Sequence, residues 1–391
     1  MKNVRIGIVG YGNIGSAHAC CIASGSIKGL ELAAVCDISE EKLVQAAKAL
    51  PGVSRFASWQ ELMGSGLVDA VLIATPHYLH PPIAVAAFQK GLHVLTEKPA
   101  GVYTRQVEQM DEAARRSGKV YGIMFNQRTN PLYRQARELL RGGRLGTPKR
   151  LGWIITNWYR TQAYYDSGSW RATWSGEGGG VLINQAPHNL DLWQWIFGMP
   201  RRLRASCYAG KYHNIEVEDE AAIYAEYENG ATATFLTSTG EYPGTNRLEM
   251  TGDRGKLVLE DGKLRLWELN TSERAFCFAD APGSAVPSYT YQEFLPQEAE
   301  TAHAGILQNF TDAILHGEKL IAPGYEGINE LNLSNAAYLS AWTDKWVDLP
   351  VNGDLFYEEL QKRIQEGSHK ETIAGGEAAS GRYSSRWNVH W

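Results

Sequence analysis

Short apolar runs alternate with longer amphipathic stretches over the first 127 residues of the chain. The apolar runs are rich in β-branched residues and predict strands at 4–9, 32–36, 70–74, 93–96 and 120–125. Between them, apolar positions at helical spacing, closed by Gly or Pro, predict helices at 40–50, 82–90 and 105–117. Strands that alternate with helices in this way form a parallel sheet covered on both faces. The pattern therefore predicts a doubly wound α/β domain over residues 1–127.

The pattern changes after residue 127. A helix is expected at 131–141, and strands then follow one another around turn signals, at 226–229, 231–236, 257–260 and 263–267. Asp261-Gly262 stands between two alternating runs, which is typical of a hairpin. Helices predicted at 303–316 and 325–346 should cover one face of the sheet or dock on the first domain. Residues 128–366 are thus predicted to form an α+β domain with a large, mostly antiparallel, open sheet.

The last segment, 367–391, is rich in Gly, Ser and Ala but carries Trp387 and Trp391 near its end. Leaving two tryptophans in water is costly. We therefore expect this tail to pack on its own subunit or on a neighbouring one.

Composition narrows the class of protein. The 391 residues are 44% hydrophobic and 21% charged, as in globular domains, and the net charge of −5 gives no basic excess for binding nucleic acid. Five cysteines without CxxC spacing argue against a disulfide framework or a zinc cluster, and no metal is expected. Unpaired thiols fit the cytosol, no apolar run reaches the roughly 18 residues needed to cross a bilayer, and the first strand begins too early for a secretory signal to precede it. We therefore expect a cytoplasmic protein.

A glycine-rich motif follows the first predicted strand and opens a helix. It reads Gly10-Tyr11-Gly12-Asn13-Ile14-Gly15, and the second strand ends in Asp37, 22 residues beyond Gly15. This spacing is typical of dinucleotide binding, with phosphates at the helix N-terminus and the carboxylate on the ribose hydroxyls. Asp37 would repel a 2′-phosphate, and no Arg follows at 38–41, so NAD is favoured over NADP. The alternative interpretation is a set of turn glycines beside a surface aspartate.

Two further residues are candidates for chemistry. Lys98 follows the fourth strand, where its ammonium could stabilise the oxygen of a substrate. His188 follows the run Gly178-Gly179-Gly180, and a helix there would place it on one face with Asn184, four residues earlier. An imidazole titrates near neutral pH and can act as a base. Read singly, Lys98 could be a solvated lysine, and His188 could be held by Asp191 one turn later.

Together, the motif at 10–15, Glu97-Lys98-Pro99 and the segment 178–188 resemble the Gfo/Idh/MocA family of oxidoreductases over about residues 1–360. The resemblance implies a Rossmann domain joined to an open-sheet α+β domain, and an NAD(P)-dependent dehydrogenase of sugars, inositols or related polyols. It implies that Lys98 contacts nicotinamide and substrate and that His188 transfers the proton. Along the nicotinamide half of the cofactor it places Thr75, Pro76, His80, Glu97 and Asn126.

The chain departs from the family pattern at one position. The family usually has Asp four residues before the histidine, and this chain has Asn184. An amide cannot carry the carboxylate's charge but can donate or accept a hydrogen bond, so Asn184 is interpreted as a substrate-binding residue.

Aromatic residues gather where the substrate is expected. Six of the 12 tryptophans fall between residues 153 and 195, mixed with tyrosines and hydrogen-bonding side chains. Sugars offer apolar C–H faces rimmed by hydroxyls, which suits such a surface. The candidate substrate-binding residues, besides Lys98, Asn184 and His188, are Arg128, Tyr159, Tyr165, Trp170 and Arg171. The alternative is that these aromatics fill the core or a subunit contact.

The expected activity is hydride transfer between NAD and a secondary hydroxyl or ketone carbon of a sugar, glycoside or cyclitol. Two alternatives stay open: redox-neutral cleavage or epimerisation of a glycoside by tightly bound NAD, and a non-catalytic NAD-binding sensor. The family resemblance also implies a homodimer or homotetramer.

Overall fold

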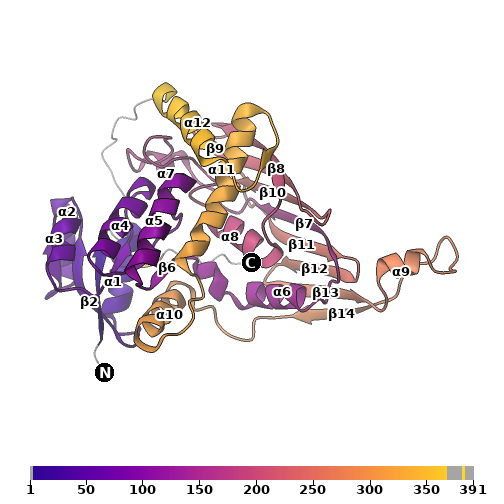
Figure 1. Ribbon diagram of the computed structural model, residues 1–391, viewed down its shortest axis with the longest axis horizontal. Helices are drawn as coiled ribbons and strands as arrows, with labels where there is room; N and C mark the ends of the chain where they lie inside the picture. The colour runs from indigo at the N-terminus through magenta and orange to yellow at the C-terminus, as the bar shows by residue number, and fades with distance from the viewer. Residues whose placement is uncertain (1–2, 368–380, 384–391) are drawn as a thin grey trace.

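The computed structural model describes residues 3–367 and 381–383, whose strands form two sheets (Figure 1). The first sheet has six strands in the order β3-β2-β1-β4-β5-β6, all parallel. Its strands are β1 (Val4–Val9), β2 (Leu30–Cys36), β3 (Ser54–Phe56), β4 (Ala70–Ile73), β5 (His93–Thr96) and β6 (Tyr121–Ile123). Helices cover both faces, which is why all four residues of β4 are buried. The predicted doubly wound domain is confirmed.

Local sequence signals account for the ends of helices in this first half. Ser39 caps α2 by accepting a hydrogen bond from the backbone N–H of Lys42, and Gly118 ends α5 in the left-handed conformation. The helices are α1 (Asn13–Ala23), α2 (Glu40–Ala49), α3 (Trp59–Gly64), η1 (His77–Leu79), α4 (His80–Gln89) and α5 (Thr104–Ser117).

The second sheet has nine strands in the described residues, in the order β14-β13-β12-β11-β7-β10-β9-β8-β15. Only β7 and β10 pair in parallel, so the sheet is mostly antiparallel, as predicted. Asp261 and Gly262 both have positive φ and turn β12 into β13, which confirms the predicted hairpin. The strands are β7 (Pro148–Ile155), β8 (Arg202–Ala209), β9 (Glu218–Glu226), β10 (Thr232–Ser238), β11 (Asn246–Gly252), β12 (Gly255–Glu260), β13 (Lys263–Leu269), β14 (Tyr289–Phe294) and β15 (Val347–Asp348).

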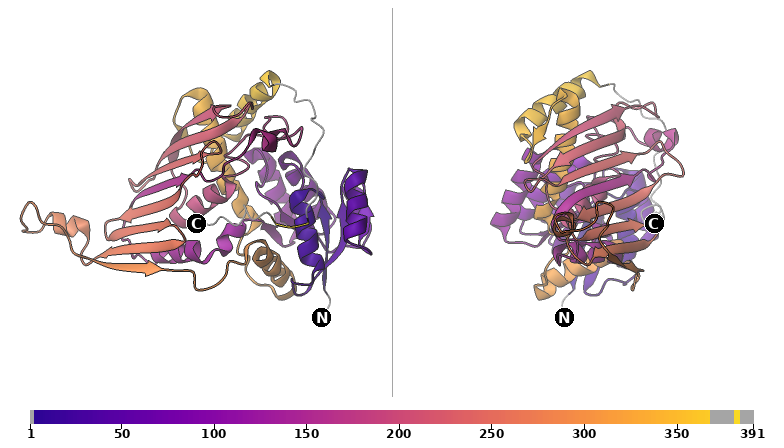
Figure 2. Two further views of the ribbon diagram at one scale, coloured as in Figure 1. Left: turned by 180° about the vertical axis from the view of Figure 1, so that it is seen from behind. Right: turned by 90° about the vertical axis from the view of Figure 1, so that its right-hand side faces the viewer.

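Helices α6, α8 and α11 lie on one face of the nine-stranded sheet, whereas α9 projects beyond the ends of its strands and α10 packs against the first half (Figure 2). The other face of the sheet carries no helix among the described residues. Helix α11 packs against both α5 and β8, so it joins the two halves. The helical elements are η2 (Asn126–Thr129), α6 (Pro131–Arg141), α7 (Gln162–Asp166), α8 (Pro187–Phe197), α9 (Glu273–Cys277), α10 (Ala302–His316), η3 (Gly324–Glu326), α11 (Gly327–Thr343) and α12 (Gly353–Glu366).

Two predicted elements of this half have different bounds. The strand expected at 226–229 is wrong, because β9 ends at Glu226 and the chain then turns at 228–230. The helix expected at 325–346 is shorter, because Asp344 adopts a left-handed conformation that ends α11 at Thr343.

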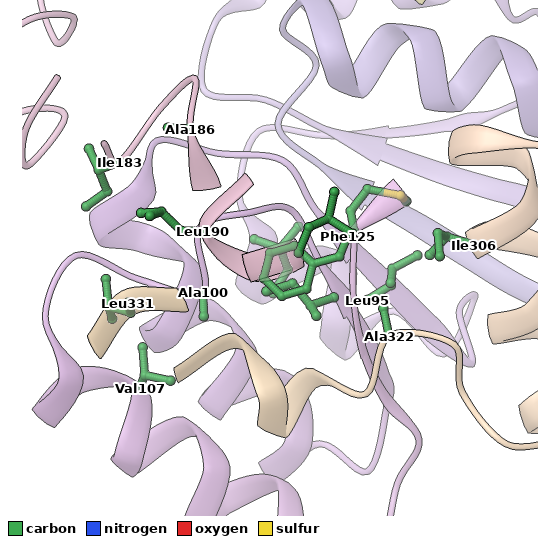
Figure 3. Packing of buried hydrophobic residues seen from close by; sticks show 14 of the residues in the cluster. Leu95, Ala100, Val107, Phe125, Ile183, Ala186, Leu190, Ile306, Ala322 and Leu331 are labelled. Carbon is green, nitrogen blue, oxygen red and sulfur yellow. The ribbon is translucent and has the colours of Figure 1, made fainter. Parts of the chain in front are cut away.

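The hydrophobic core runs continuously through both halves. Figure 3 shows Leu95 and Phe125 of the first half beside Leu190 of α8, Ile306 of α10 and Ala322. The backbone N–H of Ile123 in β6 donates to the carbonyl of Ala322 (3.1 Å), and Gly122 forms an antiparallel bridge with Pro323. A segment that follows β14 in the sequence therefore protects the edge of the first sheet. The division of the chain at residues 127 and 366 stays a prediction.

The described part of the C-terminal segment, 381–383, lies against the first half of the chain. The backbone N–H of Gly381 donates to Oγ of Ser16 in α1 (3.2 Å). The predicted packing of Trp387 and Trp391 concerns residues outside those that the structure describes.

Candidate functional site

The glycine-rich motif forms a tight turn between β1 and α1. Gly10 has φ +97°, and a Cβ there would lie 2.4 Å from the carbonyl of Ala74, while one on Gly15 would lie 1.9 Å from the carbonyl of Gly10. Only Gly fits at these two positions. A Cβ on Gly12, by contrast, would meet only Nζ of Lys42, at 4.0 Å. Backbone at Gly12 is therefore open to a phosphate, as the motif predicts.

Asp37 lies at the end of β2, beside the turn. Its Oδ2 accepts the backbone N–H of Tyr11 (2.7 Å), and its Oδ1 accepts that of Ser39 (2.9 Å). Nζ of Lys42, one turn into α2, lies 3.6 Å from Oδ2. Lys42 was not among the predicted site residues, although its position two residues into α2 follows from the same segment of the sequence. Its ammonium partly offsets the negative charge of Asp37.

The residues expected along the nicotinamide half lie at the ends of β4 and β5 and at the start of η2. Oγ1 of Thr75 and Oδ1 of Asn126 are buried and have no hydrogen-bond partner in the described part of the chain. Buried polar atoms are nearly always paired in folded proteins. The two unpaired oxygens could hydrogen-bond the polar groups of a dinucleotide at this position. Pro76 has no polar side-chain atom and could make only van der Waals contacts with it.

His80 has a bracing role. One ring nitrogen lies 2.8 Å from the carbonyl of Pro99 and the other 2.7 Å from that of Thr75. Both polar atoms of the His80 ring face backbone carbonyls of the protein, and the nitrogen that carries the proton donates to its carbonyl, so His80 links the loops after β4 and β5.

Glu97 is held by a histidine that the sequence analysis did not select. Nε2 of His18, on α1, lies 2.7 Å from Oε1 of Glu97, and the backbone N–H of Lys98 donates to Oε2 (3.2 Å). Burial acts to raise the pKa of Glu97, but the hydrogen bond from His18, with help from its charge and that of Lys98, lowers it to about 2. The carboxylate is ionised beneath the Lys98 backbone.

Lys98 connects the two halves of the site. Its Nζ donates to the backbone carbonyl of Asn184 (2.6 Å). Burial lowers the pKa of Lys98, and the negative charges of Glu97, Glu330 and Glu177 oppose that shift. Residues 98 and 184, far apart in sequence, thus form one site.

The three glycines before Asn184 serve the fold. A Cβ on Gly179 would lie 2.2 Å from the hydroxyl of Tyr338, and one on Gly180 would lie 1.9 Å from the carbonyl of Glu218. The Glu218 carboxylate also accepts the N–H groups of Gly180 (2.9 Å) and Leu182 (2.8 Å). These glycines therefore let the backbone approach Tyr338 and β9 closely.

Asn184 and His188 do not share a helix, and that prediction is wrong. Helix α8 begins at Pro187, whose missing N–H suits a first helical position, so Asn184 lies in the turns before the helix. Asp191 does not hold His188, because it pairs with Arg128. The Nδ1 atom of His188 is buried and has no hydrogen-bond partner among the described residues.

The electrostatic surroundings keep His188 neutral. Burial lowers its pKa well below the usual value, the charge of Lys98 adds to that effect, and Glu97 opposes it. A neutral imidazole with an unpartnered nitrogen is the form that can accept a proton. The structure therefore places an ammonium and a free base within electrostatic reach of each other.

The candidate substrate residues fall into two groups. Trp170 and Arg171 lie beside the site: the guanidinium of Arg171 stacks 4.6 Å above the Trp170 ring and donates to the hydroxyl of Tyr164 (2.9 Å), to which Asn184 also donates (3.3 Å). The Trp170 ring packs 5.8 Å from that of His77 in η1. Tyr164 was missed, although it stands in the aromatic segment that the sequence analysis selected.

The other three are used elsewhere. Arg128 is 1% exposed. Two of its nitrogens donate to Asp191 (2.8 and 2.6 Å) and the third donates to Glu326 (2.5 Å). All three nitrogens of the guanidinium are therefore engaged within the protein. Tyr165 is 1% exposed and its hydroxyl bonds Thr239 (2.7 Å). Tyr159 packs at the surface, 6.0 Å from the Tyr242 ring.

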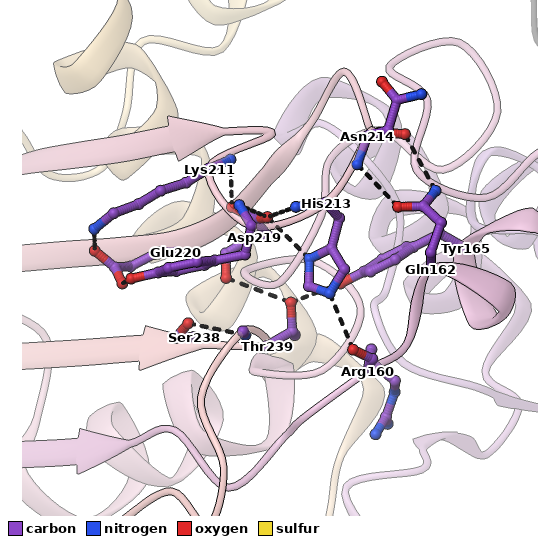
Figure 4. Close-up of polar contacts among 12 residues, drawn as sticks. Arg160, Gln162, Tyr165, Lys211, His213, Asn214, Asp219, Glu220, Ser238 and Thr239 are labelled. Carbon is purple, nitrogen blue, oxygen red and sulfur yellow. Dashed lines mark hydrogen bonds and ion pairs between the residues drawn. The ribbon is translucent and has the colours of Figure 1, made fainter.

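A buried polar cluster fixes the aromatic segment on the second sheet. Asp219 of β9 bonds Nδ1 of His213 (2.9 Å) and accepts the N–H groups of 211–213, and Nε2 of His213 lies 3.0 Å from the carbonyl of Arg160 (Figure 4). The Tyr165 ring packs 4.8 Å from that of His213. This cluster explains why Tyr165 is part of the framework.

The described residues contain no group of three or more His, Cys, Asp and Glu arranged to hold a metal ion. No helix in the same residues is both long and apolar enough to cross a membrane.

Comparison with known proteins identifies two matching regions. Residues 4–125 match the sequence model described as an oxidoreductase family with an NAD-binding Rossmann fold, and 133–258 match that of a GFO/IDH/MocA C-terminal domain. Levoglucosan dehydrogenase of Pseudarthrobacter phenanthrenivorans is 24% identical over 389 residues, covering 90% of this chain and 99% of that protein. The scyllo-inositol 2-dehydrogenase (NAD(+)) of Bacillus subtilis is 23% identical, covering 85% of this chain and 93% of that protein.

Among solved structures, the WlbA dehydrogenase of Bordetella pertussis, in complex with NADH and UDP-GlcNAcA, superposes with a TM-score of 0.75 and 27% identity, covering 90% of this chain and 100% of that one. Levoglucosan dehydrogenase in complex with NADH and levoglucosan shares the fold, with a TM-score of 0.74 and 20% identity, covering 89% of this chain and 100% of that one.

Proposed function

Because this chain belongs to the Gfo/Idh/MocA family of oxidoreductases, with an NAD-binding Rossmann domain, we propose that it transfers a hydride between NAD and a secondary hydroxyl or ketone carbon of a sugar, glycoside or cyclitol. The resemblance inferred from the motifs is confirmed. The substrate class is supported by the named substrates of two relatives, levoglucosan and an inositol, and by the hydrogen-bonding aromatic segment beside Lys98.

The cofactor position follows from the residues that fit it. The turn at Gly12 would receive the pyrophosphate, Asp37 the ribose hydroxyls, and Thr75 and Asn126 the polar groups of the nicotinamide half. When bound there, NAD⁺ supplies an acceptor for the hydride of the substrate carbon.

Two side chains act on the substrate oxygen. The neutral imidazole of His188 accepts the hydroxyl proton, and the ammonium of Lys98 donates a hydrogen bond to the oxygen as negative charge develops on it. The backbone carbonyl of Asn184 fixes the ammonium at 2.6 Å. Trp170 and Arg171 offer an apolar face and a cation at the side where the substrate rim would lie.

One observation carries this proposal: Lys98 of the first half bonds the turn that leads into His188, whose Nδ1 has no partner among the described residues. This arrangement supports the proposal that His188 accepts the proton while Lys98 stabilises the developing charge on the substrate oxygen.

The test measures NADH formation from a panel of polyols, including levoglucosan and myo-inositol, by its near-ultraviolet absorbance. His188→Ala is expected to lower kcat by roughly 10²–10⁴-fold while leaving NAD affinity intact. Unchanged turnover in this variant would remove His188 from the mechanism. Glycoside breakdown or epimerisation without NADH release would favour the redox-neutral alternative, and NAD binding without any turnover would favour the sensor.

We also propose that the helix-free face of the nine-stranded sheet forms the contact of a homodimer or homotetramer. Ile154 of β7 and Tyr224 of β9, both 41% exposed, lie on that face and support the proposal. Light scattering tests it, and charging the face by Ile154→Glu should dissociate the oligomer. A cytoplasmic location is supported by the absence of disulfides among the five cysteines, all of which the structure describes.

A further inference from the structure

Asn184 stands where the family usually has aspartate, and its amide is already engaged. Its Nδ2 donates to Oε1 of Glu177 and, at 3.3 Å, to the hydroxyl of Tyr164. A carboxylate only accepts hydrogen bonds, so the amide must present its NH₂ group to Glu177. The Oδ1 of Asn184 then faces away from that carboxylate and accepts no hydrogen bond within the described residues, which leaves it available to a substrate.

Glu177 is a fixed, buried carboxyl that the mechanism above does not use. It is 1% exposed, and its Oε2 accepts the backbone N–H of Ala172 (2.6 Å). Its own backbone carbonyl lies 2.9 Å from Nδ1 of His77 in η1, so contacts from both halves of the protein set its position. Burial raises the pKa of Glu177, and the charges of Arg171 and Lys98, with the N–H donors of Ala172 and Asn184, oppose that shift.

We propose that Glu177 is a positioning residue that acts through Asn184, orienting and polarising its amide so that Oδ1 accepts a hydrogen bond from a substrate hydroxyl adjacent to the reacting carbon. The pair takes the place of the family's single aspartate. An aspartate at 184 would put two carboxylates in contact, which strongly disfavours ionising both. An amide at 184 follows from having Glu177 beside it.

The geometry also restricts the substrate class. Lys98 bonds the backbone carbonyl of Asn184, and the acceptor Oδ1 belongs to the same residue. Oxygens held by Lys98 and by Oδ1 must therefore be near neighbours on one substrate. This inference, which rests on the proposed function, narrows the substrates to vicinal diols. In the reaction the C–H hydride goes to NAD⁺ and the O–H proton to His188, leaving a ketone, and Glu177 and Asn184 gain and lose no proton.

A charge exchange between the two positions tests the pairing. Glu177→Gln should raise KM for the diol about tenfold or more and leave KM for NAD unchanged, because the amide loses its charged partner. Asn184→Asp alone should lower both activity and the melting temperature through repulsion with Glu177. The double variant Glu177→Gln/Asn184→Asp should recover both, since the glutamine amide introduced at position 177 can then donate to the new carboxylate. The melting temperature reports this recovery without any substrate.

A second arm uses the substrate. The substrates are the best diol of the panel and its analogue that lacks the hydroxyl next to the reacting carbon. In the wild type, kcat/KM for the analogue should be ten- to a hundredfold lower than for the diol. In Glu177→Gln the difference in kcat/KM between the two compounds should be much smaller. Glu216→Gln is the matched control. Glu216 accepts the backbone N–H of Trp174 (2.7 Å), which lies in the same loop as Glu177. The Glu216→Gln variant should leave the diol preference unchanged.

Two outcomes in an active enzyme overturn the inference. The first is a double variant whose activity and melting temperature are no higher than those of Asn184→Asp. The second is a preference for the diol over the deoxy analogue that is equally strong in the wild type and in Glu177→Gln. If no polyol of the panel yields NADH with the wild type, the proposed function itself fails.

Discussion

The hydroxyl of Tyr383 lies 2.8 Å from Nδ1 of His18, a residue 365 positions earlier in the chain. The other nitrogen of His18 bonds Glu97 at 2.7 Å, and the Tyr383 ring stacks on that of His303 with centroids 4.4 Å apart. The C-terminal segment therefore reaches, through one histidine, the carboxylate beneath Lys98. Because a carboxylate only accepts, Nε2 of His18 must donate to Glu97, and the phenol is a suitable donor for Nδ1.

Tyr383→Phe should destabilise the protein by about 1–3 kcal/mol, because Nδ1 of the fully buried His18 loses its hydroxyl partner. Urea unfolding measures the difference. Tyr242→Phe is the control, since Tyr242 is 82% exposed, and it should change stability little. Equal stability of the two variants would show that the contact of Tyr383 with His18 has no energetic weight.

Asp37→Ser should shift the cofactor preference toward NADP. The substitution removes the charge that would repel a 2′-phosphate and frees Lys42, which lies 3.6 Å from the carboxylate. The ratio of kcat/KM for NADP to that for NAD measures the shift and should rise at least tenfold. Adding Lys42→Met should abolish the gain for NADP. A ratio that stays constant in Asp37→Ser would contradict the assignment of Asp37 to the ribose.

Arg128→Met should unfold more easily, with a loss of about 3–5 kcal/mol, because it leaves Asp191 buried without its cation. Asp191 and Arg128 are 1% exposed each. The double variant Arg128→Met/Asp191→Leu should recover part of the loss, as calorimetry or denaturant titration would show. If Arg128 bound substrate instead, the single variant would raise KM and keep its stability.

Stability should depend on pH through His93. Its Nδ1 accepts the backbone N–H of Val120 (2.9 Å), and burial, aided by Lys119, lowers its pKa to about 4. As the pH falls from 6.5 to 4, the unfolded chain takes up a proton at this residue and the folded protein does not. The wild type should therefore lose stability relative to His93→Asn, by at most about 1.4 kcal/mol per pH unit. Above pH 7 the difference between the two proteins should be constant, and parallel curves throughout would refute the prediction.

Local signals predicted the first half of the chain well. The glycine turn, Asp37 and the strand ends at Val9 and Thr96 depend on neighbouring residues, so the sequence contains what is needed to place them. The contacts of the candidate site were harder to predict from the sequence, because they join segments that are far apart along the chain. Nothing local indicates that Tyr383 meets His18, or that Arg128 is committed to Asp191.

One error had a local cause. Pro187 at a first helical position explains why Asn184 lies outside α8. Glu177, directly before the three glycines, was not predicted, and a lone carboxyl in a loop is usually solvated. Its burial depends on Ala172 and on η1, which only the fold brings together. Strands such as β8 were missed because half of their residues face the open side of the sheet, where apolar alternation is weak.

The hydrogen bond from Ile123 to Ala322 has a consequence for the newly made chain. Strand β6 pairs with β5 on one side only, and the backbone that protects its other side is synthesised about 200 residues later. At ribosomal rates of roughly 5–20 residues per second, the edge stays exposed for about 10–40 s. Until then the nascent N-terminal half presents unpaired backbone groups along β6, at which another polypeptide could add a strand.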